Sequence, residues 1–134
     1  MTYFPPKSLD ELVARYAAGE RHFVGAELDL GLPPEGIVDL AGAVLDGADF
    51  SGCWFDTSFR GASLKATTFR RANVKCCDFT GANLTDADFR EAAMEATTWS
   101  GATLLGTKFG MVSLYGAHLT EAEFLAMIEG EPFT

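Results

Sequence analysis

The sequence has few of the residues that build catalytic and metal sites. Its 134 residues include only three cysteines and two histidines. His22 and His118 stand far apart, and neither has a cysteine or carboxylate at metal-ligand spacing. With Cys76 and Cys77 adjacent, the cysteines have neither the even number nor the spacing of a disulfide framework. We therefore expect free thiols, no metal and no cofactor.

Long apolar runs are also missing. No stretch approaches the roughly 18 apolar residues of a membrane-spanning helix, and residues 1–10 lack a basic segment followed by an apolar one. The hydrophobic fraction of 48% and the charged fraction of 22% are those of an ordinary globular chain. These features predict one soluble domain over residues 1–134, in the cytoplasm and without a membrane partner.

What the sequence does contain is a repeat of five residues. A small, a polar and a large apolar residue recur in this order from Val38 to Leu119, with Ala117 as the last small residue. The large positions are Leu40, Leu45, Phe50, Phe55, Phe59, Leu64, Phe69, Val74, Phe79, Leu84, Phe89, Met94, Trp99, Leu104, Phe109, Leu114 and Leu119. Neither a helix nor a flat strand has a period of five. The pattern is typical of a solenoid with one short side per pentad.

Four pentads form a longer repeat of twenty residues. From Thr57 onward the rows align without a gap, and Gly61, Gly81 and Gly101 follow a large residue at the same place in each row. Glycine at such a bend indicates a turn with positive φ. Aromatic and aliphatic large residues alternate along the chain, so opposite sides of a four-sided coil carry the same type. Each layer can then fill a constant cross-section.

The repeat resembles that of the pentapeptide repeat family. Its clearest copies are ADF at 48–50, CDF at 77–79, ANL at 82–84 and ADF at 87–89. The resemblance covers roughly residues 23–119. It implies an all-β fold, a right-handed quadrilateral parallel β-helix in which the small and the large side chains both point inward.

The N-terminal end of this coil is predicted to carry a capping helix over residues 8–19. Ser8 and Glu11 form a capping box, apolar residues follow at helical spacing, and Gly19 ends the helix. The apolar face of the helix would cover the open end of the coil, where strand edges are otherwise unpaired. A helix that binds a partner is the alternative.

The C-terminal end has a second capping box. Thr120 and Glu123 predict a helix over residues 120–130 that covers the last turn. In several members of the family that the sequence resembles, the C-terminal end forms a homodimer. A monomer and a C-terminally mediated homodimer therefore both stay open.

Two interruptions break the five-residue repeat. Near residues 30–36 the chain contains two prolines and is two residues longer than the repeat requires, which predicts a loop. Between Phe50 and Phe59 the chain is one residue short, which predicts a shortened side at residues 53–56. Such a break is either a functional feature or a tolerated deletion. Trp54, beside the slip, is a candidate partner-binding residue.

Charge weighs against the best-known function that the resemblance implies, in which quinolone-resistance proteins imitate B-DNA and bind type II topoisomerases such as gyrase. The net charge is −9, but residues 57–119 hold five acidic and seven basic side chains. Residues 1–56 hold ten acidic and three basic side chains, and residues 120–134 hold four acidic and none basic. A DNA mimic needs negative charge along its whole length, because the duplex carries one charge about every 1.7 Å. That role is kept as the alternative.

The side of the coil that contains Phe69, Phe89 and Phe109 has the most basic residues. It carries Arg70, Arg71, Arg90 and Lys108 alongside Asp88 and Glu91. Mixed charge of this kind is either a solvated surface or a site for an acidic partner. Together with Trp54, the four basic residues are the candidate partner-binding residues. The negative total charge argues against direct binding to nucleic acid.

No arrangement typical of an enzyme is present. Asp86, Asp88, Glu91 and Glu95 are close in sequence, but the coil sends them to different sides and corners, which disfavours a paired general acid and base. Cys76 has no base nearby in the repeat that would activate it. The sequence therefore predicts a non-catalytic protein-interaction module that presents flat faces to an unidentified protein.

Overall fold

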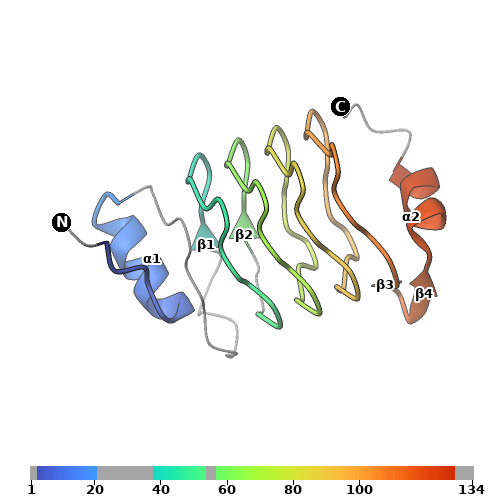
Figure 1. Ribbon diagram of the computed structural model, residues 1–134, viewed down its shortest axis with the longest axis horizontal. Helices are drawn as coiled ribbons and strands as arrows, with labels where there is room; N and C mark the ends of the chain where they lie inside the picture. Colours follow the sequence, from blue (N-terminus) through green and yellow to red (C-terminus); the bar gives the residue numbers. More distant parts are fainter. Residues whose placement is uncertain (1–2, 21–37, 54–56, 129–134) are drawn as a thin grey trace.

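The computed structural model describes residues 3–20, 38–53 and 57–128. The elements are α1 (Leu9–Ala17), β1 (Val38–Asp39), β2 (Thr57–Ser58), β3 (Val112–Leu114), β4 (Ala117–Leu119) and α2 (Glu121–Ile128). Between β2 and β3 the chain runs in successive turns stacked along the long axis of the molecule (Figure 1). The two helices lie at opposite ends of this coil (Figure 1). Within the described residues, neither helix has the length and apolar character that a bilayer-spanning segment requires.

The turns pair in parallel at the middle of each side. Bridges join Ser63 to Asn83 and Asn83 to Thr103 on one side, and Asp88 to Lys108 on another. Each partner lies one twenty-residue row further along the chain. The pairing confirms that four pentads make one turn and explains why long strands are rare, since most described sides offer only one bridged residue.

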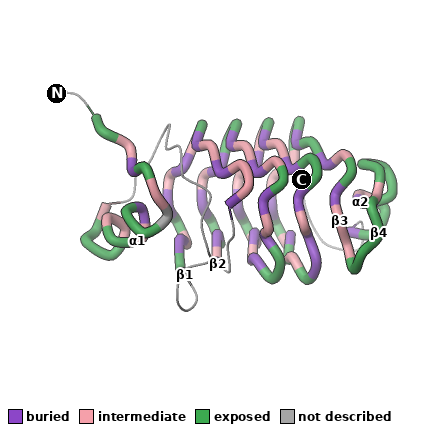
Figure 2. Tube along the Cα trace, turned by 90° about the horizontal axis from the view of Figure 1, so that it is seen from below, coloured by how far each residue is buried: buried purple, intermediate pink, exposed green. Residues whose placement is uncertain are grey.

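The small and large residues of each pentad fill the interior. Phe59, Phe69, Phe79 and Phe89 are fully buried. The rings of Phe59 and Phe79 stack at 5.3 Å, and those of Phe69 and Phe89 stack at 4.7 Å, each pair within 3° of parallel. Figure 2 shows buried residues recurring along the sides and exposed residues gathering at the corners. Each fully buried large side chain contributes roughly 1.5–3 kcal/mol to folding, so the repeat is the main source of stability.

The polar residue at the middle of each side stabilises the corner that follows. Asp49, Asn73, Asp78, Asn83 and Asp88 each accept a hydrogen bond through Oδ1 from the backbone N–H two residues later, at 2.9–3.2 Å. This is an Asx turn, which shapes the chain for a sharp bend. The acidic or amide residue in the repeat is therefore explained by local structure.

The corners turn through residues with positive φ. Gly61, Gly81 and Gly101 have φ values of 65°, 69° and 68°, which confirms the prediction made for these glycines. Other corners have the same conformation without glycine, at Ala66, Arg71, Cys76, Asp86, Glu91, Ala96 and Met111. The fold therefore imposes left-handed backbone on residues that do not favour it.

The register shows the predicted slip. Val44 pairs with Ser63 and Asp49 with Thr68, so these partners are one residue closer in sequence than Ser58 and its partner Asp78. The register therefore changes between Cys53 and Thr57, whose carbonyl oxygens accept hydrogen bonds from Asn73 N and Asp78 N, respectively. The predicted loop near residues 30–36, most of the shortened side and Trp54 lie outside the described residues.

Helix α1 covers the N-terminal end of the coil. The Ser8 hydroxyl accepts a hydrogen bond from the Glu11 backbone N–H at 3.0 Å, as the capping box predicts. Leu12 is fully buried in the core, and the Tyr16 hydroxyl donates to the carbonyl oxygen of Ala41 at 2.7 Å. The helix therefore packs on the first described turn, and its apolar face is occupied within the chain.

The coil ends in a hairpin. Strands β3 and β4 pair antiparallel, and Tyr115 and Gly116 between them have φ values of 49° and 83°. Two positive φ values are typical of a type I′ turn, which reverses the chain instead of carrying it into another coil turn. Ala117 is consequently exposed. The prediction that Ala117 fills an inward position was wrong for this reason.

Helix α2 covers the C-terminal end. Thr120 and Glu123 exchange hydrogen bonds, from Glu123 N to Thr120 Oγ1 at 3.2 Å and from Thr120 N to Glu123 Oε1 at 3.0 Å. Phe124 is buried, with its ring centroid 4.8 Å from Phe109 and 6.0 Å from Trp99. The aromatic column of the coil thus ends on a residue of the helix.

Candidate partner-binding surface

Three of the predicted residues lie on one corner of the coil. Gly52 N donates to the carbonyl oxygen of Arg70 at 2.9 Å, and Arg71 N donates to that of Arg90 at 3.1 Å. These bonds stack residues 51–52, 70–71 and 90–91 in successive turns. We call these six residues the arginine corner.

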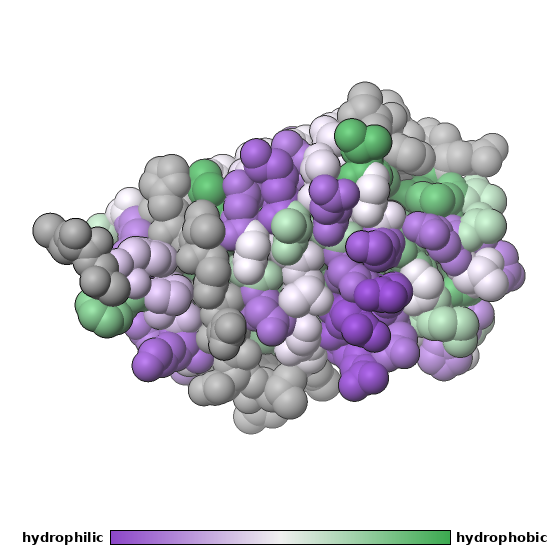
Figure 3. Space-filling model, in the orientation of Figure 1, coloured by the Kyte–Doolittle hydropathy of each residue, from purple (hydrophilic) through white to green (hydrophobic). Residues whose placement is uncertain are grey.

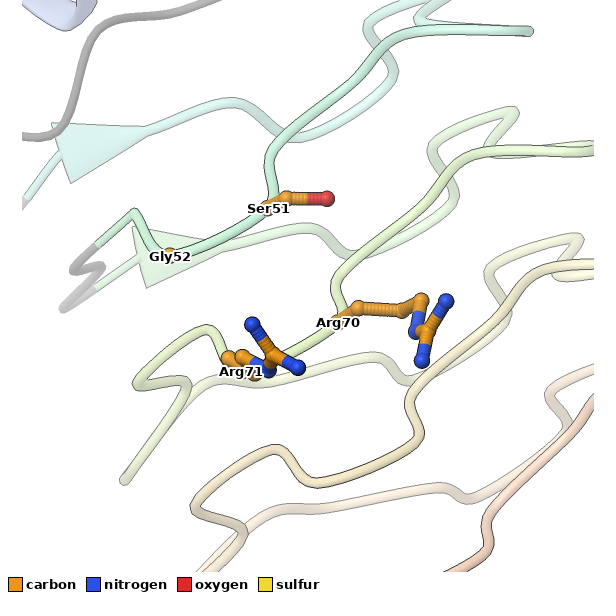
Figure 4. A pocket seen from close by; sticks show the side chains of 4 residues that line it. All are labelled: Ser51, Gly52, Arg70 and Arg71. Carbon is orange, nitrogen blue, oxygen red and sulfur yellow. The ribbon is translucent and has the colours of Figure 1, made fainter.

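A pocket opens on the arginine corner. It has a volume of about 340 Å³ and is lined by Ser51, Gly52, Arg70 and Arg71. In Figure 4, Ser51 and Gly52 come from one turn and the two arginines from the next. The short side chain of Ser51 and the bare backbone of Gly52 leave the space that the arginines border.

Arg70 is half-buried and lacks a counter-ion among the described residues. Its Nε is buried and has no hydrogen-bond partner there. A buried donor without a partner is costly, more so when it belongs to a charged group. Arg70 is therefore the residue of this corner whose bonding capacity is least satisfied.

Arg90 is held by Asp88 of its own side. Its Nε lies 3.0 Å from Oδ1 and 3.1 Å from Oδ2 of Asp88, and its Nη2 lies 2.7 Å from Oδ2. Partial burial acts to raise the pKa of Asp88, but the hydrogen bonds from Arg90, followed by the charges of Arg90 and Arg70, hold it below its usual value. Arg90 is thus oriented by a forked ion pair.

Arg71 forms an ion pair between turns. Its Nε donates to Oε2 of Glu91 at 2.7 Å, and this hydrogen bond lowers the pKa of Glu91 and raises that of Arg71. Both side chains are exposed, so the pair contributes little to stability. It does restrain the guanidinium beside the pocket.

Lys108 lies on the adjoining side and not on the arginine corner. It is exposed, pairs through its backbone with Asp88, and makes no ion pair with a described residue. The structure thus brings Arg70, Arg71 and Arg90 together and places Lys108 nearby. The role of these residues in binding a partner stays a prediction, as does that of Trp54.

Sequence reasoning missed Ser51 and Gly52 as lining residues. They were missed because the chain is one residue short between Phe50 and Phe59. Ser51 aligns with Arg70 in the twenty-residue repeat only when this missing residue is taken into account. Aligning residues 50–52 with residues 69–71 across the slip would have found them.

The remaining charges of the coil are mostly paired across turns. Asp78 contacts Arg60 at 3.1 Å, Asp46 lies 4.0 Å from Lys65, and Glu95 lies 3.9 Å from Lys75. With the pairs of Asp88 and Glu91, five carboxylates of the described coil have a cation beside them. Among the described carboxylates of the coil, Asp39, Asp49 and Asp86 form no ion pair.

The part of the chain that the structure describes contains no group of three or more histidine, cysteine, aspartate or glutamate residues that could hold a metal ion. Cys53 and Cys77 are buried inside the coil, and Cys76 is exposed at a corner.

A four-sided parallel coil with a five-residue period defines a class of repeat solenoids. A family model described as a pentapeptide repeat region matches residues 40–119. The chain belongs to the pentapeptide repeat family, a non-enzymatic repeat fold, and is a right-handed quadrilateral parallel β-helix. The fold class predicted from the sequence is confirmed.

Solved structures of the family are similar to this chain. One is HetL, a pentapeptide repeat protein involved in heterocyst differentiation regulation in the cyanobacterium Nostoc sp. strain PCC 7120. It is 26% identical, with a TM-score of 0.74, and the match covers 84% of this chain but only 47% of HetL. This chain therefore spans about half the length of that relative.

A second similar structure is Rfr23, a pentapeptide repeat protein from the cyanobacterium Cyanothece 51142. It is 20% identical, with a TM-score of 0.53 over 92% of this chain and 94% of that protein. At this identity the likeness shows the fold alone. A search of curated proteins found no match.

Proposed function

We propose that this protein is a non-catalytic interaction module that binds a protein partner through the arginine corner. The observation that carries the proposal is Arg70, a half-buried guanidinium at the border of a pocket, with no counter-ion among the described residues. Binding-site arginines of this kind contribute strongly to interfaces, because they form charge-assisted hydrogen bonds when a partner removes the water.

The regular coil supports this role. The stacked rings from Phe59 to Phe109 and the turn-to-turn hydrogen bonds fix the backbone around the arginine corner. A surface that is already ordered loses less conformational entropy on binding than a flexible one. The ion pairs of Arg71 and Arg90 further restrain the side chains beside Arg70.

The ion pairs favour this function over the imitation of DNA. Asp46, Asp78, Asp88, Glu91 and Glu95 each have a cation close by, so they do not form the continuous negative surface that a gyrase-binding mimic needs. A gyrase supercoiling assay, with and without a quinolone, separates the two functions. Protection or inhibition at low micromolar protein would favour the DNA-mimic alternative.

Capture of a partner from an extract of the source cells tests the proposal. Immobilised protein is compared with the double variant Arg70→Ala and Arg71→Ala. The control, Arg60→Ala with Lys65→Ala, removes the same charge from other corners of the coil. We expect a partner that the wild type and the control retain and the Arg70/Arg71 variant loses. Equal capture by all three proteins would refute the arginine corner as the binding surface.

A further inference from the structure

We infer that the pocket of the arginine corner binds a single oxyanion group, a carboxylate or a phosphate, between Arg70, Arg71 and Ser51. The inference rests on the proposed function and names the chemical group that a partner would present there. Its basis is that hydrogen-bond donors border most of the pocket.

The groups that border the pocket are mainly donors. Arg70 and Arg71 supply two guanidinium groups, and Ser51 supplies a hydroxyl. That hydroxyl lies 3.4 Å from the Thr68 hydroxyl, and either oxygen can donate, so Ser51 can turn its proton to a ligand. Guanidinium and hydroxyl donors that surround one space are complementary to an oxyanion.

The neighbouring carboxylates are already engaged elsewhere. Asp88 binds Arg90, and Glu91 binds the Nε of Arg71. Asp49 accepts a hydrogen bond through Oδ1 from the backbone N–H of Ser51. Arg70 is the one guanidinium of the arginine corner that forms no ion pair with a described residue, although its charge acts on Asp88 and Glu91. Its hydrogen-bond donors therefore remain available to an incoming anion.

The buried Nε of Arg70 adds a structural reason. This nitrogen has no hydrogen-bond partner among the described residues although it is shielded from solvent. Because a buried donor without an acceptor is costly, an oxyanion that Arg70 turns to meet would satisfy this nitrogen. The ion pair with Glu91 leaves the terminal nitrogens of Arg71 without a described partner, so they can bind the same anion.

Nuclear magnetic resonance can observe this site in the intact protein. Nitrogen-15-labelled protein is titrated with sodium phosphate, and in a second arm with sodium acetate, at constant ionic strength. We expect a saturable shift of the Arg70 Nε–H and Ser51 amide signals, with a dissociation constant in the millimolar range. The two arms show whether the pocket prefers a phosphate or a carboxylate.

Two variants locate the binding. Arg70→Lys keeps the charge but removes the forked donor, and should weaken anion binding by about tenfold. Arg60→Lys makes the matched change at a corner where Asp78 neutralises the arginine, and should leave binding unchanged. Dispersed amide spectra confirm that each variant is folded. Shifts without saturation, or equal anion affinity in the Arg70→Lys variant and the wild type, would overturn the inference.

The outcome separates this site from the proposed function. If phosphate or acetate binds at Arg70 while partner capture survives loss of Arg70 and Arg71, the anion site stands and the proposed function falls. If capture depends on the two arginines but neither anion binds, the function stands and the oxyanion site is wrong.

Discussion

At the residue scale, the corners of the coil contain non-glycine residues in a conformation that favours glycine. Ala66 has a φ of 57°, while Gly47, one turn before it, and Gly106, two turns after it at the same corner, have φ values of 73°. The side chain of Ala66 is exposed and fills no core space. Its Cβ therefore brings the cost of left-handed backbone without a packing gain.

Replacing Ala66 with glycine should stabilise the protein. Left-handed backbone costs an L-residue about 1–2 kcal/mol, and the greater freedom of glycine in the unfolded chain offsets part of the gain, so we expect roughly 0.5–1 kcal/mol. Urea unfolding measures the change. Ala62→Gly is the control, because Ala62 is buried and its methyl group fills the core; it should lower stability. A lower urea midpoint for Ala66→Gly would contradict the corner geometry.

The ion pair of Asp88 should make stability depend on pH. The folded-state pKa of Asp88 lies below its ordinary value of 3.8, so its contribution is present above that value and is lost as the pH falls through the lower folded-state pKa. Asp88→Asn keeps the acceptor for Arg90 N but removes the charge. We expect the variant to be about 1 kcal/mol less stable near neutral pH.

The difference between the wild type and Asp88→Asn should disappear in strong acid, where the wild-type carboxyl is protonated as well. Urea midpoints across this pH range measure it. A difference that stays constant through the range would mean that the charge of Asp88 is not the cause.

The position of the polar residue in each pentad could be predicted from the sequence, but the ion pairs that the arginines form with carboxylates could not. The spacing assigned Arg70, Arg71 and Arg90 to one side, because pentads repeat regularly. Which carboxylate each arginine meets depends on side-chain torsions at the corner, and the five-residue pattern does not specify them. The unsatisfied Nε of Arg70 emerges only from that geometry.

At the element scale, the two helices close the coil. Phe124 of α2 packs on Trp99 and Phe109, and Ile128 is buried as well. Without α2, these aromatic residues of the last turn would face solvent. The helix thus protects both an apolar surface and the free edge of the coil.

Replacing Phe124 with alanine should destabilise the protein by about 3–5 kcal/mol, because it removes the side chain that covers the aromatic column. Met127→Ala is the matched control on the same helix, since Met127 is exposed, and should change stability by less than about 0.5 kcal/mol. Thermal unfolding of both variants measures the effect. Equal losses would mean that α2 does not dock through Phe124.

The capping boxes predicted both helices, yet nothing in the pentad pattern predicted the hairpin before α2. Tyr115 and Gly116 fit the spacing of an ordinary corner, which also uses positive φ at its second residue. One further positive φ, at Tyr115, turns the chain back. The sequence did not indicate a hairpin turn here, because an aromatic residue such as Tyr115 is uncommon in a type I′ turn.

At the scale of the whole molecule, the exposed large apolar side chains of the described residues do not form one flat face. Figure 3 shows apolar residues toward the end that carries α2 and hydrophilic residues over the middle of the coil. The exposed large residues of the last turns, Leu105, Met111 and Tyr115, follow three different sides of the square. A two-fold interface needs a single self-complementary patch.

We therefore propose that the protein is a monomer, since α2 already covers the last turn. Light scattering over a range of protein concentrations should give the mass of one chain, 14.4 kDa. A concentration-dependent doubling of the mass would contradict this. If Met127→Glu then restored the single-chain mass, the homodimer would be located at α2.

The central claim is that the coil binds a protein through Arg70 and its neighbours. Its most direct test is the affinity of the captured partner for the wild type, Arg70→Ala with Arg71→Ala, and Arg60→Ala with Lys65→Ala, measured by surface plasmon resonance at two salt concentrations. We expect the arginine-corner variant to bind at least about thirtyfold more weakly, which corresponds to roughly 2 kcal/mol. The control should bind like the wild type at both salt concentrations. Equal losses of affinity in the two variants, with the same salt dependence, would show general charge attraction and contradict the account.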